Sequence, residues 1–133
     1  MKFKFLDHTA DIKIRAYGKT LNEAFESIAL ALSEHICKDQ EIKSRKGKTI
    51  RITGSDIKNL LYKFIEEIIY LLDAEDFVVT KSKVNVKDNK LNAKFYGGKA
   101  SSYHLHHVKA PTYAEMHIKK KKDMWEIQAV VDV

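Results

Sequence analysis

The hydrophobic pattern of the N-terminal part of the chain predicts two strands followed by a helix. Residues 2–5 alternate lysine with phenylalanine, and Ile12–Tyr17 alternates again, as expected of strands that are buried on one face. After them, Thr20 and Glu23 have the spacing of a capping box at a helix N-terminus. The apolar stripe of this helix is formed by Leu21, Ala24, Phe25, Ile28, Leu32 and Ile36.

A wider apolar face predicts a second helix, from about Asp56 to Asp73, with Ser55 as its N-cap. This face is formed by Ile57, Leu60, Leu61, Phe64, Ile65, Ile68, Ile69 and Leu72. Before it, the polar segment Cys37–Lys48 is predicted to be a loop and Thr49–Thr53 a short strand.

The second half of the chain is predicted to consist of strands, because five segments alternate with period two, namely Phe77–Thr80, Val84–Lys87, Leu91–Tyr96, Tyr113–Lys119 and Trp125–Val131. Residues 88–90 read as a turn, and Gly97-Gly98 is expected to end the third segment. The lysine run Lys119–Lys122 is expected at a hairpin tip, and Ser101–Ala110 fits no single element.

This order of elements predicts an α+β fold, because two amphipathic helices each need a sheet face to bury against. We expect a two-layer sandwich in which two main helices pack on a mixed, mostly antiparallel sheet. With 133 residues, the chain is long enough for one hydrophobic core, so a single domain should span residues 1–133.

Composition narrows the function classes. The net charge is +6, but only three of the 24 basic residues are arginine, so diffuse attraction to an anionic partner is favoured over bidentate recognition of bases or phosphates. The single cysteine, Cys37, excludes an internal disulfide and a multi-cysteine zinc site, and we expect it to pack at a helix end. No signal peptide and no apolar run of about 20 residues is found, which predicts a cytoplasmic protein without a membrane segment.

The segment Asp7-His8-Thr9-Ala10-Asp11 holds oxygen and nitrogen ligands between two strands. From spacing alone, a simple turn is the favoured interpretation, because Asp and Thr satisfy nearby backbone groups. The chain also ends on an apolar strand, which puts Asp132 beside the terminal carboxylate of Val133. Two such anionic groups would suit a hard divalent cation (Ca²⁺, Mg²⁺ or Mn²⁺), but from these residues alone a solvated strand end is the favoured interpretation.

Two further clusters are weaker candidates. His104 and His106 would share one face of a strand, next to His107, but such a pair is usually no more than polar surface. The lysine run is interpreted as a solvated tip that speeds encounter with an anionic partner. By contrast, Lys109 lies between apolar residues, a position where a lysine often meets a carboxylate or a phosphate. No Gly-rich phosphate loop, G-x-S-x-G, C-x-x-C or H-E-x-x-H motif is present, so no self-sufficient nucleophile is indicated.

Together, these segments resemble the archease family. The resemblance is carried by residues 5–12 (FLDHTADI), 16–25 (AYGKTLNEAF), 108–113 (VKAPTY) and 130–133 (VVDV), and it spans essentially the whole chain. It implies a compact α+β domain that acts as a protein cofactor of the RtcB-type RNA ligase, which joins tRNA halves during tRNA splicing. It implies that the protein promotes GTP-dependent guanylylation of the ligase and multiple turnover.

The resemblance also implies the site. The family's metal ligands fall on Asp11, Asp132 and Val133, with Asp7 and His8 as candidates for the surrounding shell, and the lysine essential for activation falls on Lys109. The alternative function is a small metal-dependent phosphohydrolase or nuclease that uses the Asp7-His8-Asp11 segment and Asp132. A plain RNA-binding module is a third reading, and the scarcity of arginine argues against it.

Overall fold

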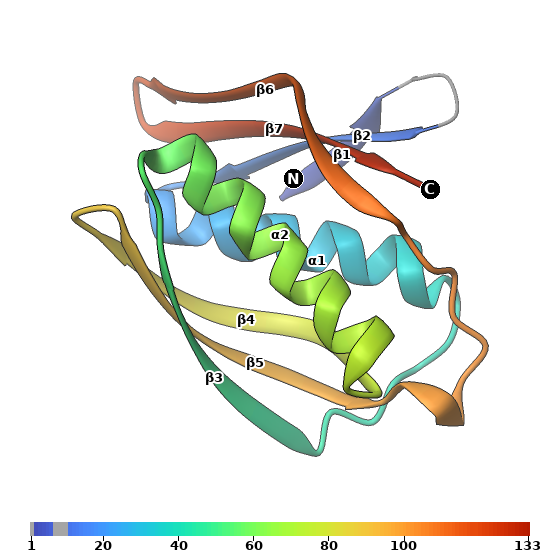
Figure 1. The fold of residues 1–133 in the computed structure, drawn as a ribbon. Coiled ribbons are helices and arrows are strands. Elements are labelled where there is room, and N and C mark those ends of the chain that lie inside the picture. The colour runs from blue at the N-terminus through green and yellow to red at the C-terminus, as the bar shows by residue number, and fades with distance from the viewer. Residues whose placement is uncertain (1, 7–10) are drawn as a thin grey trace.

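The computed structural model describes residues 2–6 and 11–133, and Figure 1 shows how their elements are arranged. Two separate antiparallel sheets enclose both helices. The first sheet has the strand order β1-β2-β7-β6 and is built from β1 (Phe3–Leu6), β2 (Asp11–Gly18), β7 (Met124–Asp132) and β6 (Ala110–Lys121). The second has the order β3-β5-β4 and is built from β3 (Lys46–Thr53), β5 (Lys90–Lys99) and β4 (Phe77–Lys87).

Helices α1 (Leu21–Cys37) and α2 (Ile57–Ala74) lie between the two sheets. The expected α+β fold, with two helices packed against antiparallel strands, is confirmed. The structure adds that the strands divide into two sheets, and that every strand pair in the described residues is antiparallel. Neither described helix combines the length and the apolar character that crossing a membrane requires.

Both helices begin at side-chain caps. Thr20 Oγ1 accepts a hydrogen bond from the Glu23 N–H at 3.1 Å, as predicted, and Glu23 reaches back to the N–H of Lys19 at 2.9 Å. The predicted cap of α2 was wrong by one residue. Asp56, not Ser55, accepts from the Asn59 N–H at 2.8 Å, and a carboxylate at this position also complements the positive end of the helix dipole.

Three buried aromatic side chains connect the helices to the three-stranded sheet. The ring of Phe64 on α2 lies 5.6 Å, between ring centroids, from Phe25 on α1 and also 5.6 Å from Phe95 on β5. All three side chains are fully buried. Aromatic contacts of this geometry add to the stabilisation that burial of the rings supplies, so they join both helices to this sheet.

The predicted end of a strand at Gly97-Gly98 was wrong, because β5 continues through both glycines to Lys99. A Cβ atom at Gly97 would lie 1.9 Å from the carbonyl oxygen of Val78, so only glycine lets β4 and β5 approach closely here.

The two segments predicted on β4 form one strand, with an irregularity between Val79 and Lys81. The turn before β5 is confirmed, and Asp88 and Asn89 both have positive φ, as in a type I′ hairpin.

The segment that fitted no single element, Ser101–Ala110, contains the end of a short 3₁₀ helix (Ala100–Ser102) and an extended stretch that leads into β6. The N–H of His106 donates to the carbonyl of Ile36 at 2.8 Å and ties this stretch to the end of α1. The lysine run was misplaced as a tip: three of its residues lie within β6, and only Lys122 is in the turn.

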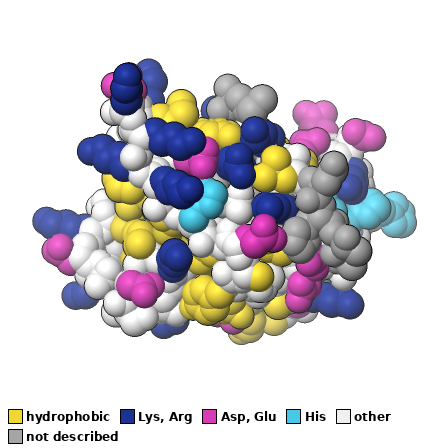
Figure 2. All heavy atoms as spheres, turned by 90° about the horizontal axis from the view of Figure 1, so that it is seen from above, with side chains coloured by type: hydrophobic (Ala, Val, Ile, Leu, Met, Phe, Trp, Pro, Cys, Tyr) yellow, Lys and Arg dark blue, Asp and Glu magenta, His cyan; other side chains and the backbone are white. Residues whose placement is uncertain are grey.

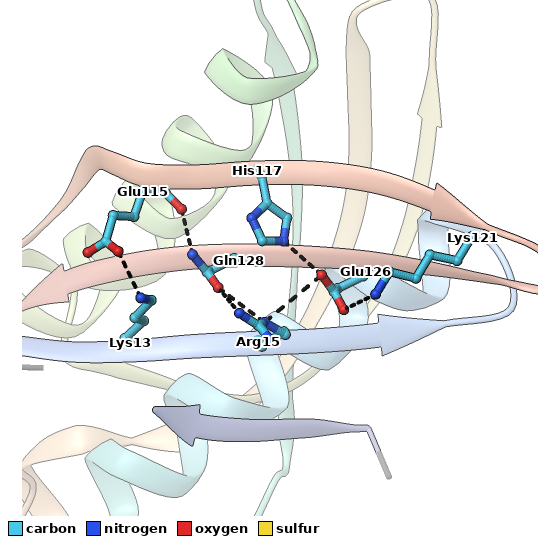
Figure 3. A network of polar contacts seen from close by, with 7 residues as sticks. All are labelled: Lys13, Arg15, Glu115, His117, Lys121, Glu126 and Gln128. Carbon is cyan, nitrogen blue, oxygen red and sulfur yellow. Dashed lines mark hydrogen bonds and ion pairs between the residues drawn. The ribbon is translucent and has the colours of Figure 1, made fainter. Parts of the chain in front are cut away.

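The outer face of the four-stranded sheet carries many lysine and arginine side chains (Figure 2). On this face Glu126, near the start of β7, is only 5% exposed, and both of its carboxylate oxygens are engaged (Figure 3). Lys121 donates to Oε1 at 3.0 Å, and Nε2 of His117 lies 2.8 Å from Oε2. Nε of Arg15 is 4.0 Å from Oε2, and the guanidinium also donates to Gln128 Oε1 at 2.7 Å and 3.1 Å. One buried carboxylate therefore holds three basic side chains in place.

Burial alone would raise the pKa of Glu126, but the hydrogen bonds from Lys121 and His117 outweigh it, so the pKa lies below its ordinary value. Glu126→Gln is therefore expected to lower the free energy of unfolding at pH 7 by about 2 kcal/mol. Because the folded-state pKa is lowered, this stabilisation is complete above the ordinary glutamate pKa and is lost as the pH falls through the folded-state value.

Denaturant unfolding at several pH values checks this prediction, and the two proteins should converge in stability in acid. Glu115→Gln is the matched control, because Glu115 lies on the same sheet, its carboxylate binds Lys13 at 2.8 Å and its side chain is 49% exposed. An exposed ion pair of this kind should change stability by no more than about 1 kcal/mol. Equal losses in both variants would contradict the central role of Glu126.

Candidate functional site

The candidate site is built first by the pairing of β2 with β7. In this antiparallel pair Asp11, the first residue of β2, lies opposite Asp132, the last residue of β7. Residues that face each other across a strand pair project from the same side of the sheet. Residues that are 121 positions apart in the printed sequence thus meet at one end of the sheet, as the sequence analysis predicted for these two carboxylates.

The two carboxyl groups interact directly. A hydrogen bond with Asp11 raises the pKa of Asp132, and slight desolvation and the negative charge of Asp11 act in the same direction. Two carboxylates this close repel each other when both are ionised, so they share a proton or need a cation nearby. Part of the repulsion is offset by Lys109, whose positive charge lowers the pKa of Asp132.

Lys109 directly precedes β6, an edge strand of the same sheet. Its N–H donates to the carbonyl oxygen of Asp132 at 2.8 Å, and the next residue, Ala110, lies opposite Asp132 in the β6–β7 pair. Val108, on its other side, is buried and anchors the segment, while the Lys109 side chain is exposed. The structure therefore brings together three of the residues that the sequence analysis selected.

The remaining predicted residues divide into two groups. Val133 follows Asp132 directly and its side chain is 40% exposed. Asp7 and His8 lie outside the described residues, so their assignment to the surrounding shell, and the alternative catalytic set that includes them, stay predictions.

The donor set fits a hard divalent cation. Asp11 and Asp132 supply carboxylate oxygens, which suit Ca²⁺, Mg²⁺ or Mn²⁺ better than zinc. In residues 2–6 and 11–133, no three His, Cys, Asp or Glu side chains gather closely enough to hold a metal ion. A cation at the Asp11–Asp132 pair would thus need further oxygen ligands, which could come from water, from the main-chain carboxylate of Val133 or from a bound phosphate.

The histidine cluster does not form a comparable site. His104 and His106 are exposed, and Nδ1 of His107 lies 3.2 Å from the carboxylate of Asp73 on α2.

Cys37 is buried at the end of α1, as predicted. Burial raises the pKa of its thiol, and a raised pKa makes a cysteine less reactive.

A hollow beside Lys109 was missed by the sequence analysis. It has a volume of about 600 Å³ and is also lined by Arg51 on β3 and by Lys63 and Tyr70 on α2. These residues come from separate elements and share no motif, so no spacing along the chain could have indicated them.

Comparisons with known proteins show the family and agree with the fold. The model of the "Archease protein family (MTH1598/TM1083)" matches residues 3–133. The chain is 39% identical over 137 residues to protein archease of Sulfurisphaera tokodaii and 41% identical over 140 residues to that of Pyrococcus furiosus, and each alignment covers 99% of both chains.

Two solved structures share the fold. The solution structure of Methanobacterium thermoautotrophicum protein 1598 matches with a TM-score of 0.74 at 27% identity and 98% coverage of both chains. The crystal structure of a Thermotoga maritima archease, described as a "possible chaperone", matches with a TM-score of 0.68 at 19% identity, over 98% of this chain and 96% of that one. By its sequence over nearly its full length, this chain belongs to the archease protein family.

Proposed function

We propose that this protein activates an RtcB-type RNA ligase in tRNA splicing, as a protein cofactor and not as a ligase itself. It would promote the GTP-dependent guanylylation of the ligase and allow repeated turnover. Membership of the archease family supports this proposal. The description of the Thermotoga maritima archease as a possible chaperone likewise concerns a protein that assists another protein.

The observation that carries the proposal is the convergence of Asp11, Asp132 and Lys109 at one end of the four-stranded sheet. The site combines oxygen ligands with an exposed ammonium group, which suits contact with nucleotide phosphates. A divalent cation held by Asp11, Asp132 and the carboxylate of Val133 would supply positive charge for those phosphates. Lys109 would add a point charge at the same place.

A ligation time course at low ligase concentration, with and without this protein, tests the proposal. The protein should increase the number of turnovers per ligase molecule and the amount of guanylylated ligase. A parallel incubation of the protein alone with Mg²⁺ or Mn²⁺ and a model RNA or nucleotide tests the alternative. Turnover in that incubation would support a phosphohydrolase or nuclease, and an unchanged ligation rate would contradict the activator.

Binding of a divalent cation is predicted to stabilise the isolated protein. Ca²⁺, Mg²⁺ or Mn²⁺ should raise its Tm in a concentration-dependent way, because an ion that binds only the folded state stabilises that state. Asp11→Asn removes a charged ligand, so the ion concentration needed for the same rise in Tm should increase at least roughly tenfold. Asp123→Asn, in the β6–β7 turn, is a control with the same charge change and should respond like the unaltered protein.

Appending residues after Val133 should weaken the ion effect as well, because the terminal charge is then displaced. Equal Tm shifts in all variants would place any bound ion elsewhere in the protein.

Lys109→Ala is predicted to lower the ligation rate at least roughly tenfold at saturating protein, while the Tm stays nearly unchanged because the side chain is exposed. Lys109→Arg should restore only part of the rate, since a planar guanidinium does not replace a compact ammonium. Lys58→Gln, at another exposed position, serves as the control. Full activity of the alanine variant would remove Lys109 from the site.

A further inference from the structure

The hollow beside Lys109 lies between the open edges of the two sheets. β3 is an edge strand of one sheet and β6 is an edge strand of the other, and α2 packs against both. Its lining includes the end of β3, the middle of α2 and the start of β6. The volume of about 600 Å³ falls within the range of sites that hold small molecules.

Three basic side chains from three different segments line this hollow: Arg51, Lys63 and Lys109. Lys63 donates one hydrogen bond, to the carbonyl of Thr53 at 2.9 Å, which leaves further N–H donors of its ammonium group available. Among the described residues, the guanidinium of Arg51 has no hydrogen-bond or ion-pair partner. These three positive charges exceed the two negative charges of Glu66 and Glu67 in the same lining, so this concave surface favours an anion.

The rest of the lining differs from that of a simple anion site. Tyr70 on α2 is 53% exposed, and its ring is a flat apolar surface at the hollow. Glu66 and Glu67 supply carboxylates that accept hydrogen bonds. A ligand that matches all three features carries several phosphates, an aromatic ring system and hydroxyl groups.

We propose that this hollow binds a nucleoside triphosphate, with the phosphates on Arg51, Lys63 and Lys109 and the base against Tyr70. Because Lys109 also lies beside Asp132, the phosphates would be held next to the candidate metal ligands. The site deepens the proposed function, and its role in ligase activation rests on that function. The nucleotide binding itself does not require the ligase.

Titration of fluorescent GTP and ATP analogues into the isolated protein tests the proposal. The double variant Arg51→Gln/Lys63→Gln should raise the Kd by roughly 100-fold, because each lost contact to a charged group corresponds to about tenfold. Lys58→Gln/Lys83→Gln removes the same charge from exposed positions outside the lining and should leave the Kd within about twofold. Lys58 is about 140° around α2 from Lys63.

Competition by inorganic tripolyphosphate separates the phosphate contacts from the base contact. Tyr70→Ala should weaken nucleotide binding by roughly tenfold, the scale of base stacking on an aromatic ring, and leave tripolyphosphate binding unchanged. Both variants replace exposed side chains, and an unchanged Tm would show that they fold.

Three results would overturn the proposal: no saturable nucleotide binding, an equal loss in the Lys58/Lys83 control, or tighter binding of a 5′-phosphorylated RNA with the same dependence on Arg51 and Lys63. An unchanged nucleotide affinity in Tyr70→Ala would reduce the site to phosphate binding alone and overturn the assignment of a nucleoside. Nucleotide binding without ligase activation would contradict only the proposed function. If Arg51→Gln/Lys63→Gln abolishes nucleotide binding while ligase activation survives, only the role of the site in activation would be contradicted.

Discussion

The pairing of β2 with β7 is the constraint on which the rest of the molecule depends. Ile14 and Ala129 lie opposite each other on its inner side and are fully buried between the sheet and the helices. A shift of this register by one residue would turn apolar side chains outward and separate Asp11 from Asp132. Burial of apolar surface in the core thus fixes the position of two carboxylates at the exposed end of the sheet.

That position is unfavourable for Asp132, since the neighbouring carboxyl group of Asp11 raises its pKa. The fold tolerates the repulsion because the strands around it are held independently, by their ladder and by the N–H of Lys109 on the backbone of Asp132. The same sheet contains the opposite arrangement 6 residues away along β7, where Glu126 is satisfied by three basic side chains. Glu126 is a carboxylate with its cations supplied, whereas the Asp11–Asp132 pair lies beside Lys109 and offers carboxylate oxygens of the kind that hold a divalent cation.

The sequence predicted what local patterns determine. Both helices, the capping of α1 and the hairpin turn before β5 follow from spacing and turn chemistry, and the archease motifs led to Asp11, Lys109 and Asp132. The division into two sheets could not be predicted, because alternation reports that a strand is half-buried and not which strand it pairs with. Gly97 was misread for a related reason: a glycine that ends a strand and one that admits a close neighbour look the same in one sequence.

The division into two sheets also explains the hollow. Had the strands formed one sheet, α2 would have buried one face and exposed the other to water. Between two sheets it packs against β6 on one side and against β3 and β4 on the other, and the strip that contains Lys63, Glu66 and Tyr70 stays open between the edge strands β3 and β6. Pro111 near the start of β6 has no N–H to offer a further strand, so this edge is poorly suited to sheet extension. Lys109, which precedes β6, lines the opening from the side of the carboxylate pair.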